Sequence, residues 1–277
     1  MNAPGAMLIA QISDMHIKAP GRLAYRRVET AGYLARCVDR LGKHRPRPDA
    51  VLATGDLVDG GRPEEYRRLR ELLEPLPMPV YLIPGNHDAR DALAAEFALH
   101  SYLPRRGTFL HYVIDRHPVR LIGLDTLVPG QGGGLMCDER LGWLGARLEE
   151  ARDRPTVIFM HHPPFATGIR RMDAQGLDNA EAMAEVVRAH PQVERVVCGH
   201  VHRSIHVRWA GTVASIAPST AHQVSLDLEG DTLTFGMEPP AYQLHLWHAG
   251  RGLVTHTVHV GDYEGPYPFY EGGKLIE

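Results

Sequence analysis

The stretch VERVVCGHVH, residues 193–202, shows the pattern that organises this chain. An apolar run rich in the β-branched residues of strands stops at Gly199, and His200 and His202 follow. In extended backbone, side chains two residues apart point to the same face, so the two imidazoles can converge. The pair predicts a metal site if other segments supply further ligands; otherwise both are ordinary hydrogen-bonded loop histidines.

Five further apolar runs end in the same abrupt way. They are residues 7–12, 50–54, 80–84, 119–124 and 156–160. Short runs rich in Val, Ile and Leu are typical of strands buried on both faces of a sheet. The polar residues that follow them are, in chain order, Asp14 and His16, Asp56, Asn86 with His87 and Asp88, Asp125, and His161 with His162.

Helical patterns separate several of these runs. Apolar residues recur at helical spacing in residues 25–44, 63–76, 138–153 and 179–190. Strands that alternate with helices predict the α/β fold class.

The last third of the chain has a different pattern. Residues 205–260 alternate apolar and polar residues between glycine-containing turns, which predicts antiparallel strands that extend or pack onto the first sheet. Residues 261–277 are rich in Gly, Pro and Tyr, which predicts an irregular tail that packs on its own chain or on a partner subunit. Because no repeat or low-complexity linker is present, we expect residues 1–277 to form a single domain.

Composition limits the partners. The 277 residues carry a net charge of -3 with His neutral, so the chain lacks the basic surface that a nucleic-acid polymer or an anionic membrane attracts. The N-terminal stretch has no basic signal-peptide region, and no apolar run is long enough to span a bilayer. Three cysteines at unrelated spacings form neither a zinc motif nor a disulfide framework, so we expect a reduced, cytoplasmic protein.

The polar residues after the strands form a candidate metal centre. In open α/β sheets, ligands bind beyond the carboxyl ends of the strands, and five of the runs deliver Asp, His or Asn there. These donors offer nitrogen and oxygen but no thiolate, which suits Mn, Fe, Co or catalytic Zn. They are too many for one ion with an open position and suit two ions, about 3.5–4 Å apart, that share a bridging carboxylate.

The motifs, taken together, resemble the signature of the calcineurin-like metallophosphoesterases. The motifs are Asp14-x-His16, Gly55-Asp56-x-x-Asp59, Gly85-Asn86-His87-Asp88, His161-His162 and Gly199-His200-x-His202. Residues 161–179, HHPPFATGIRRMDAQGLDN, and 217–223, APSTAHQ, look like the bacterial class III branch, which comprises cyclic-nucleotide and glycerophosphodiester phosphodiesterases. The resemblance implies a four-layer α/β/β/α sandwich of two mixed β-sheets flanked by helices.

The same resemblance implies a role for each site residue. One divalent ion would be held by Asp14, His16, Asp56 and His202, and the other by Asp56, Asn86, His161 and His200, with Asp56 as the bridge. His87 would be the catalytic residue that faces the substrate beside Asn86, and Asp88 would orient it. His222 would be a second phosphate contact, with a buried structural histidine as the alternative.

Asp59 distinguishes this chain from a neighbouring branch of the superfamily. Purple acid phosphatases resemble this motif set but place a tyrosine three residues after the bridging aspartate, where this chain has Asp59. Without a phenolate ligand we expect two divalent ions rather than a purple ferric centre.

The expected activity is hydrolysis of a small phosphodiester by a hydroxide that bridges the two ions, with His87 assisting the leaving oxygen. Two divalent ions, two aspartates and a hydroxide leave about one positive charge, which favours a monoanionic diester unless Arg203 or Arg170 adds more. Candidate substrates are 3′,5′-cyclic nucleotides, glycerophosphodiesters and similar small diesters.

Three other functions and two structural questions stay open. A phosphomonoesterase on the same centre is the main alternative; a nuclease is disfavoured by the charge, and a non-catalytic interaction scaffold is the least favoured. Residues 163–179 are either a rim over the site or a surface loop. A homo-oligomer, a dimer or an assembly of dimers, is expected, with residues 261–277 as a candidate contact.

Overall fold

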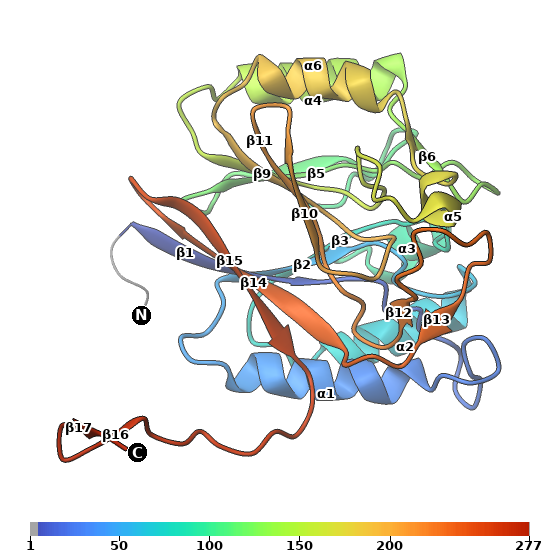
Figure 1. Ribbon diagram of the computed structural model, residues 1–277. Helices are drawn as coiled ribbons and strands as arrows, with labels where there is room; N and C mark the ends of the chain where they lie inside the picture. The colour runs from blue at the N-terminus through green and yellow to red at the C-terminus, as the bar shows by residue number, and fades with distance from the viewer. Residues whose placement is uncertain (1–4, 277) are drawn as a thin grey trace.

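Two mixed β-sheets lie face to face at the centre of the molecule, as the computed structural model, which describes residues 5–276, shows (Figure 1). The first sheet has the strand order β15-β14-β1-β2-β3, in which β1, β2 and β3 are parallel and β14 is antiparallel to both its neighbours. Its strands are β1 (Ala6–Ile12), β2 (Ala50–Thr54), β3 (Val80–Ile83), β14 (Ala241–His248) and β15 (Gly252–His259).

The second sheet has the order β10-β11-β9-β7-β5-β4. Its strands β5, β7, β9 and β11 run parallel, and an antiparallel strand closes each edge. The strands are β4 (Tyr112–Ile114), β5 (Arg120–Gly123), β7 (Thr156–Phe159), β9 (Val193–Cys198), β10 (Ile205–Trp209) and β11 (Thr212–Ile216). The carboxyl ends of the parallel strands in both sheets therefore carry the polar residues that follow the apolar runs.

Helices cover the two outer faces. Helices α1 and α2 lie against the first sheet, and α4 and α6 lie against the second, so the expected α/β/β/α layering is confirmed (Figure 1). The helices are α1 (Thr30–Lys43), α2 (Pro63–Leu73), α3 (Arg90–Glu96), α4 (Asp138–Glu149), α5 (Arg170–Asp173) and α6 (Ala180–Arg188). Within residues 5–276, no helix has the length and apolarity needed to cross a bilayer.

Three pairs of two-residue strands complete the secondary structure of the described chain. They are β6 (Gly134–Leu135) with β8 (Leu177–Asp178), β12 (Gln223–Val224) with β13 (Phe235–Gly236), and β16 (Tyr270–Glu271) with β17 (Lys274–Leu275). The first two pairs pin loops near the carboxyl ends of the central strands, and the third lies in the C-terminal tail.

Two sequence-based predictions of secondary structure were wrong in part. The helix expected over residues 25–44 begins at Thr30, because Ala24 and Val28 pair with each other in a tight turn and the Glu29 carboxylate caps the helix by accepting from Gly32 N (2.7 Å). Within the span 205–260, predicted as strands and turns, residues 225–234 form a loop between β12 and β13, because Asp227 Oδ1 accepts from the backbone of Glu229 and Gly230 and turns the chain.

A buried glutamine joins the two sheets. Gln11 lies in β1 opposite Gln243 of β14 and is fully buried. Its Nε2 donates to Thr54 Oγ1 of its own sheet (3.0 Å) and to Cys198 O of the facing sheet (2.8 Å), while its Oε1 accepts from His245 Nε2 (3.1 Å). A buried polar group is tolerated when its bonds are complete, so this residue sets how the two sheets meet next to the site.

We predict that Gln11→Leu lowers the free energy of unfolding by about 1–3 kcal/mol, because it removes the bond to Cys198 O in the facing sheet and leaves His245 Nε2 buried without a partner. Chemical denaturation, with the exposed Gln131→Leu as control, measures the difference. Equal stability of the two variants would contradict the proposed role of Gln11.

Candidate metal centre

The structure brings together the seven residues expected to bind metal. Asp14, His16 and Asp56 follow β1 and β2, and Asn86 follows β3, all in the first sheet. His161, His200 and His202 follow β7 and β9 of the second sheet. The cluster thus spans the gap between the two sheets, at the edge where their parallel strands end.

One group of donors contains Asp14, His16, Asp56 and His202. One ligand atom from each of these residues lies within 4.8 Å of all the others. His16 Nε2 is 3.1 Å from His202 Nε2 and 3.6 Å from Asp56 Oδ2, and His202 Nε2 is 3.4 Å from Asp14 Oδ1. Two carboxylates and two imidazoles that converge in this way offer nitrogen and oxygen ligands suited to a divalent cation.

A second group shares Asp56 with the first. Its other oxygen, Oδ1, lies 3.4 Å from His161 Nε2. Asn86 Oδ1 is 3.1 Å from His161 Nε2 and 3.1 Å from His200 Nδ1. The two oxygens of Asp56 therefore face different donor groups, which is the arrangement of a bridging carboxylate.

Every imidazole in the cluster is fixed by a hydrogen bond from its outer nitrogen. His16 Nδ1 donates to Asp59 Oδ1 (3.1 Å), and His161 Nδ1 donates to Thr54 O (2.8 Å). In the same way, the remaining two donate to backbone oxygens: His200 Nε2 to Gln175 O (2.9 Å), and His202 Nδ1 to His222 O (3.0 Å). Each bond selects one tautomer and leaves the inner nitrogen free to ligate, as partners of metal-bound histidines do.

Electrostatics at the centre favour cations. Burial lowers the pKa of His200 and of His202 to about 3, so both imidazoles are neutral at neutral pH, as ligands must be. Burial and the neighbouring Asp56 raise the pKa of Asp14. Asp14 Oδ2 is buried without a hydrogen-bond partner among the described residues. Two buried carboxylates and an unsatisfied oxygen are what a bound cation would compensate.

The backbone at this edge is strained. Five of the seven residues have positive φ: Asp14 (53°), His16 (45°), Asp56 (45°), His200 (73°) and His202 (54°). Left-handed backbone is unfavourable for residues with a Cβ and clusters at functional sites. It also corrects the sequence-based expectation, because His200 and His202 converge through left-handed turns and not through strand alternation.

Two glycines make room for this cluster. A Cβ on Gly85 would collide with the backbone nitrogen of Asp56 and approach His161 Nε2 to 2.8 Å. A Cβ on Gly199 would lie 2.6 Å from Thr54 O. Backbone segments from different strands pass too closely at both points for any side chain.

The expectation that Asp88 orients His87 was wrong. Asp88 accepts from Gly85 N (2.8 Å), Leu57 N (3.1 Å) and the Tyr66 hydroxyl (2.8 Å), so it ties the loop after β2 to the loop after β3. Burial, together with the charge of Asp56, raises the pKa of Asp88 to about 6.

Asp59 is the residue that sequence reasoning undervalued. Its backbone carbonyl accepts from His87 Nδ1 (2.9 Å), while its carboxylate accepts from His16 and from Lys18 Nζ (2.8 Å). Its position three residues after Asp56 was the available signal. That position was interpreted only as lacking the tyrosine ligand of purple acid phosphatases. One residue thus orients both a candidate metal ligand and the candidate catalytic histidine.

A cavity of about 280 Å³ opens over the cluster. His87 and His222 line it, together with an apolar wall that includes Tyr25, Val224 and Phe235. The His222 ring lies 4.8 Å from that of His202 and 5.2 Å from that of Phe235, and its Nδ1 has no partner among the described residues.

The segment 163–179 forms part of the rim. Met172 and Gln175 line the same cavity, and the Gln175 carbonyl holds His200. The alternative of a surface loop unrelated to the site is therefore wrong. His162 is bonded away from the cavity, with Nδ1 2.8 Å from Thr126 Oγ1 and Nε2 3.2 Å from Gly132 O.

We predict that Asp56→Asn abolishes binding at both donor groups, because one neutral amide cannot replace a carboxylate shared between two cations. After loading with Mn²⁺ and desalting, elemental analysis should give about two ions per chain for the parent protein. The variant should retain less than one, and the exposed Asp153→Asn should behave as the parent. Retention of two ions by Asp56→Asn would rule out the shared site.

Known proteins resemble this chain in sequence and in fold. The family model of the calcineurin-like phosphoesterases matches residues 7–204. A probable glycerophosphodiester phosphodiesterase GpdQ of Arcobacter nitrofigilis is 42% identical over 274 residues, which cover 98% of this chain and 100% of that protein. The 3′,5′-cyclic adenosine monophosphate phosphodiesterase CpdA of Pseudomonas aeruginosa is 31% identical, over 93% of this chain and 91% of its own length.

A solved structure gives the same fold. The dimetal phosphatase from Danio rerio superimposes with a TM-score of 0.63 at 16% identity, over 92% of this chain and 99% of the other. The resemblance first carried by the motifs is confirmed, and the chain belongs to the calcineurin-like phosphoesterase family.

Proposed function

We propose that this chain is a dimetal phosphodiesterase that hydrolyses small phosphodiesters. The observation that carries the proposal is the pair of donor groups that share Asp56, with every imidazole already turned inward by a hydrogen bond. The relatives named as glycerophosphodiester and cyclic-nucleotide phosphodiesterases support the diester class.

The donor set fits two divalent ions. Asp14, His16, Asp56 and His202 would hold one, and Asp56, Asn86, His161 and His200 the other. When bound, such ions lower the pKa of a coordinated water and neutralise charge on the phosphoryl oxygens. The absence of thiolates among these donors favours Mn, Fe, Co or Zn.

The bridging carboxylate is ionised and held in place by the chain. Burial alone would raise the pKa of Asp56, but His161, His87 and His16 together outweigh burial, and the pKa lies well below its usual range. The backbone nitrogen of His87 donates to Asp56 Oδ1 (2.9 Å). The loop after β3 thus fixes the carboxylate and presents the His87 side chain to the same cavity.

His87 is suited to assist the leaving group. Its Nδ1 donates to Asp59 O (2.9 Å), which leaves Nε2 for the substrate, and its side chain is about one-third exposed, at 32%. In the imidazolium form, Nε2 can donate a proton to the departing oxygen. His222 Nδ1, which has no hydrogen-bond partner among the described residues, is positioned to contact a phosphate oxygen as the substrate enters.

Charge favours a diester over a monoester. With two divalent ions and a hydroxide bound, the two aspartates would leave about one positive charge, which a monoanion matches. Arg203 adds little, because its guanidinium pairs with Glu238 at 3.0 and 3.1 Å, on the surface. A phosphomonoesterase would be better served by a free arginine, and a scaffold without activity would not need a complete donor set.

The cavity of about 280 Å³ suits a small substrate, not a nucleic-acid polymer. Its apolar wall can accept either a nucleobase and ribose or a glycerol ester, so both substrate classes remain in the proposal. The three cysteines, an odd number that forms no disulfide framework, favour a cytoplasmic location.

We predict that the protein, stripped with chelator and reloaded with Mn²⁺, cleaves a bis-aryl phosphate faster than the matching mono-aryl phosphate. Initial rates on both esters, with Asp56→Ala as control, decide the class. Metal-dependent diester cleavage would then be followed by assays on a 3′,5′-cyclic nucleotide and a glycerophosphodiester. A preference for the monoester would replace this proposal with a phosphatase, and a rate independent of Asp56 would refute the site.

We predict that His87→Ala lowers kcat for the diester by about 10²–10⁴-fold, because a positioned acid is lost. The metal content should stay near that of the parent, because His87 is not among the proposed ligands. His256→Ala, at an exposed histidine, is the matched control. Parallel loss of activity and metal would show that His87 serves the centre and not the leaving group.

A further inference from the structure

The loop between β12 and β13 connects two walls of the cavity over the metal donors. Residues 225–234, which we call the strap, rise from these two short strands to α5 (Figure 1). The end of the strap belongs to one wall, because Leu233 and Thr234 line the cavity together with Val224 and Phe235. The strap is therefore part of the site and not a remote surface loop.

The tip of the strap packs against the segment that forms the opposite wall. A Cβ added to Gly168 would lie 3.4 Å from Leu228 Cδ2, so the leucine packs directly on the backbone of this turn. Met172 of the same segment lines the cavity. The contact between Leu228 and Gly168 thus joins the two walls.

The segment under the tip is fixed in place. Asp173 Oδ1 accepts from Thr167 N and from Thr167 Oγ1, both at 2.7 Å, and its Oδ2 accepts from Gly168 N (2.9 Å). The next turn is tied to the metal centre, because Gln175 O accepts from His200 Nε2 (2.9 Å). Leu228 therefore packs on a part of the rim that cannot move without disturbing the site.

The strap itself is held more loosely. Among the described residues its hydrogen bonds are internal, such as Ser225 N to Thr234 O (2.9 Å). Leu226 and Leu228 are 62% and 53% exposed, so little buried apolar surface holds the tip down. Few buried contacts and few bonds to the body are typical of segments that open locally. The tip can lift from Gly168 while β12 and β13 stay paired.

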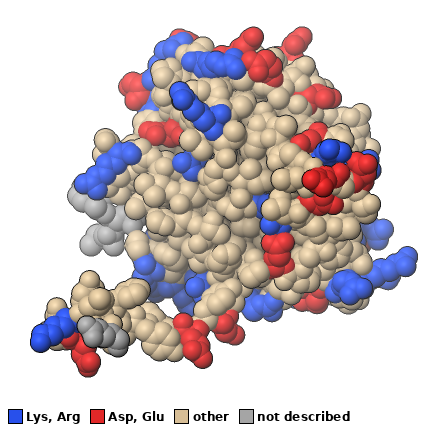
Figure 2. Space-filling view, viewed as in Figure 1, with Lys and Arg blue, Asp and Glu red and all other residues tan. Residues whose placement is uncertain are grey.

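Charged side chains lie around the same contact. Figure 2 shows basic and acidic side chains side by side in this part of the surface. The backbone N–H groups of Gly230 and Glu229 lower the pKa of Asp227. The charge of Arg170 in α5 lowers the same pKa further. Because Arg170 and Asp227 are both exposed, their attraction is weak and screened by salt, and the Leu228 contact is the main link.

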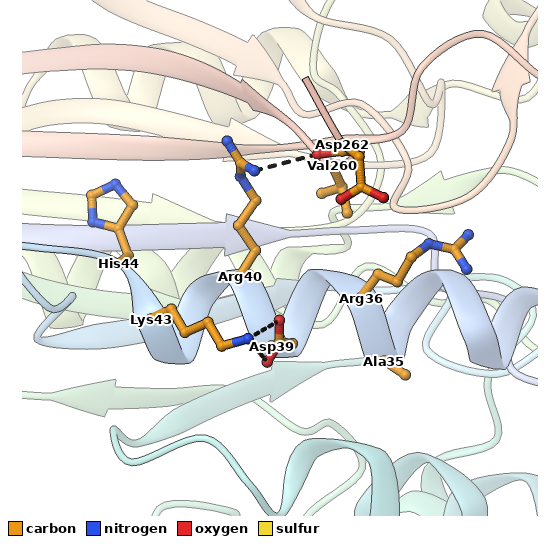
Figure 3. Close-up of a pocket in the computed structure, with 9 residues that line it drawn as sticks. Ala35, Arg36, Asp39, Arg40, Lys43, His44, Val260 and Asp262 are labelled. Atoms are coloured by element: carbon orange, nitrogen blue, oxygen red, sulfur yellow. Dashed lines mark hydrogen bonds and ion pairs between the residues drawn. The ribbon is translucent and has the colours of Figure 1, made fainter. Parts of the chain in front are cut away.

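A diester with two bulky ester groups needs more room than this cavity of about 280 Å³ provides. The groove beside α1 is larger, at about 610 Å³ (Figure 3), but it has no described lining residue in common with the cavity and cannot receive the second group. A hollow of about 620 Å³ adjoins the cavity across Met172 and Gln175, which line both. The strap packs on the rim segment between these two spaces.

We propose that the strap limits the size of the diester that the site accepts, and that Leu228 sets this limit by closing the cavity against Gly168. The inference rests on the proposed diesterase function of the same site. A diester with one small ester group fits under the closed strap, whereas two bulky groups require Leu228 to leave Gly168. Leu228 is thus a specificity-determining residue that touches neither the ions nor the phosphate.

Two esters with the same leaving group measure the limit. Methyl para-nitrophenyl phosphate has one small group, and thymidine 5′-para-nitrophenyl phosphate carries a nucleoside in its place. In the Mn²⁺-loaded protein, Leu228→Ser should raise kcat/KM for the nucleoside ester by about tenfold, the scale of small changes in an apolar contact, and leave that for the methyl ester unchanged. Leu228→Ala should act in the same direction. Leu226→Ser, the same change at another exposed leucine of the strap, should match the parent for both esters.

Failure of this inference differs from failure of the proposed function. A parent protein that cleaves neither ester would overturn both. A parent that cleaves the methyl ester, together with Leu228 variants whose ratio of the two kcat/KM values is unchanged, would overturn the strap alone. An equal gain in Leu226→Ser, or a fall for both esters in the Leu228 variants, would also overturn it. Circular dichroism and metal content verify that each variant is folded and loaded.

Discussion

The structure depends on placing the Asp56 carboxylate, with almost no access to water, at the point where the two sheets meet. A buried carboxylate needs several donors or cations around it. Asp56 receives a backbone bond from the loop after β3 and faces His16 from its own sheet and His161 from the other. The two facing sheets must therefore end at the same edge and keep a fixed position relative to each other. Gln11 of the first sheet helps to maintain that position by its hydrogen bond to Cys198 O of the second sheet.

The sequence predicted the inner part of the site well, because the information is local. Buried parallel strands read as short apolar runs, and the polar residues at their ends must gather at one edge of the sheets. His161 and Asp14 could thus be placed near each other although 147 positions, 161 minus 14, separate them in the chain. The family resemblance then divided the donors between two ions.

The surrounding part could not be predicted, because it rests on backbone atoms and on conformation. Three of the four imidazoles are held by the carbonyls of Thr54, Gln175 and His222, and any residue carries a carbonyl. The left-handed backbone of the ligand residues has no clear signature, since none of them is glycine. Asp88 was misassigned for a related reason: its partners are backbone nitrogens of a neighbouring loop and a distant hydroxyl.

The metal side and the substrate side of the site have different origins. Strand ends supply the donors, whereas the loops that contain Tyr25, Met172 and Phe235 supply the wall of the cavity. Loops vary more freely than strand ends, so a shared metal centre is compatible with different small diesters.

The most direct test of the shared metal centre is a crystal structure of the Mn²⁺-loaded protein with anomalous scattering data collected at the manganese edge. A centre bridged by Asp56 predicts two anomalous peaks about 3.5–4 Å apart, one against each oxygen of that carboxylate. A single peak, or two peaks that do not share Asp56, would contradict it.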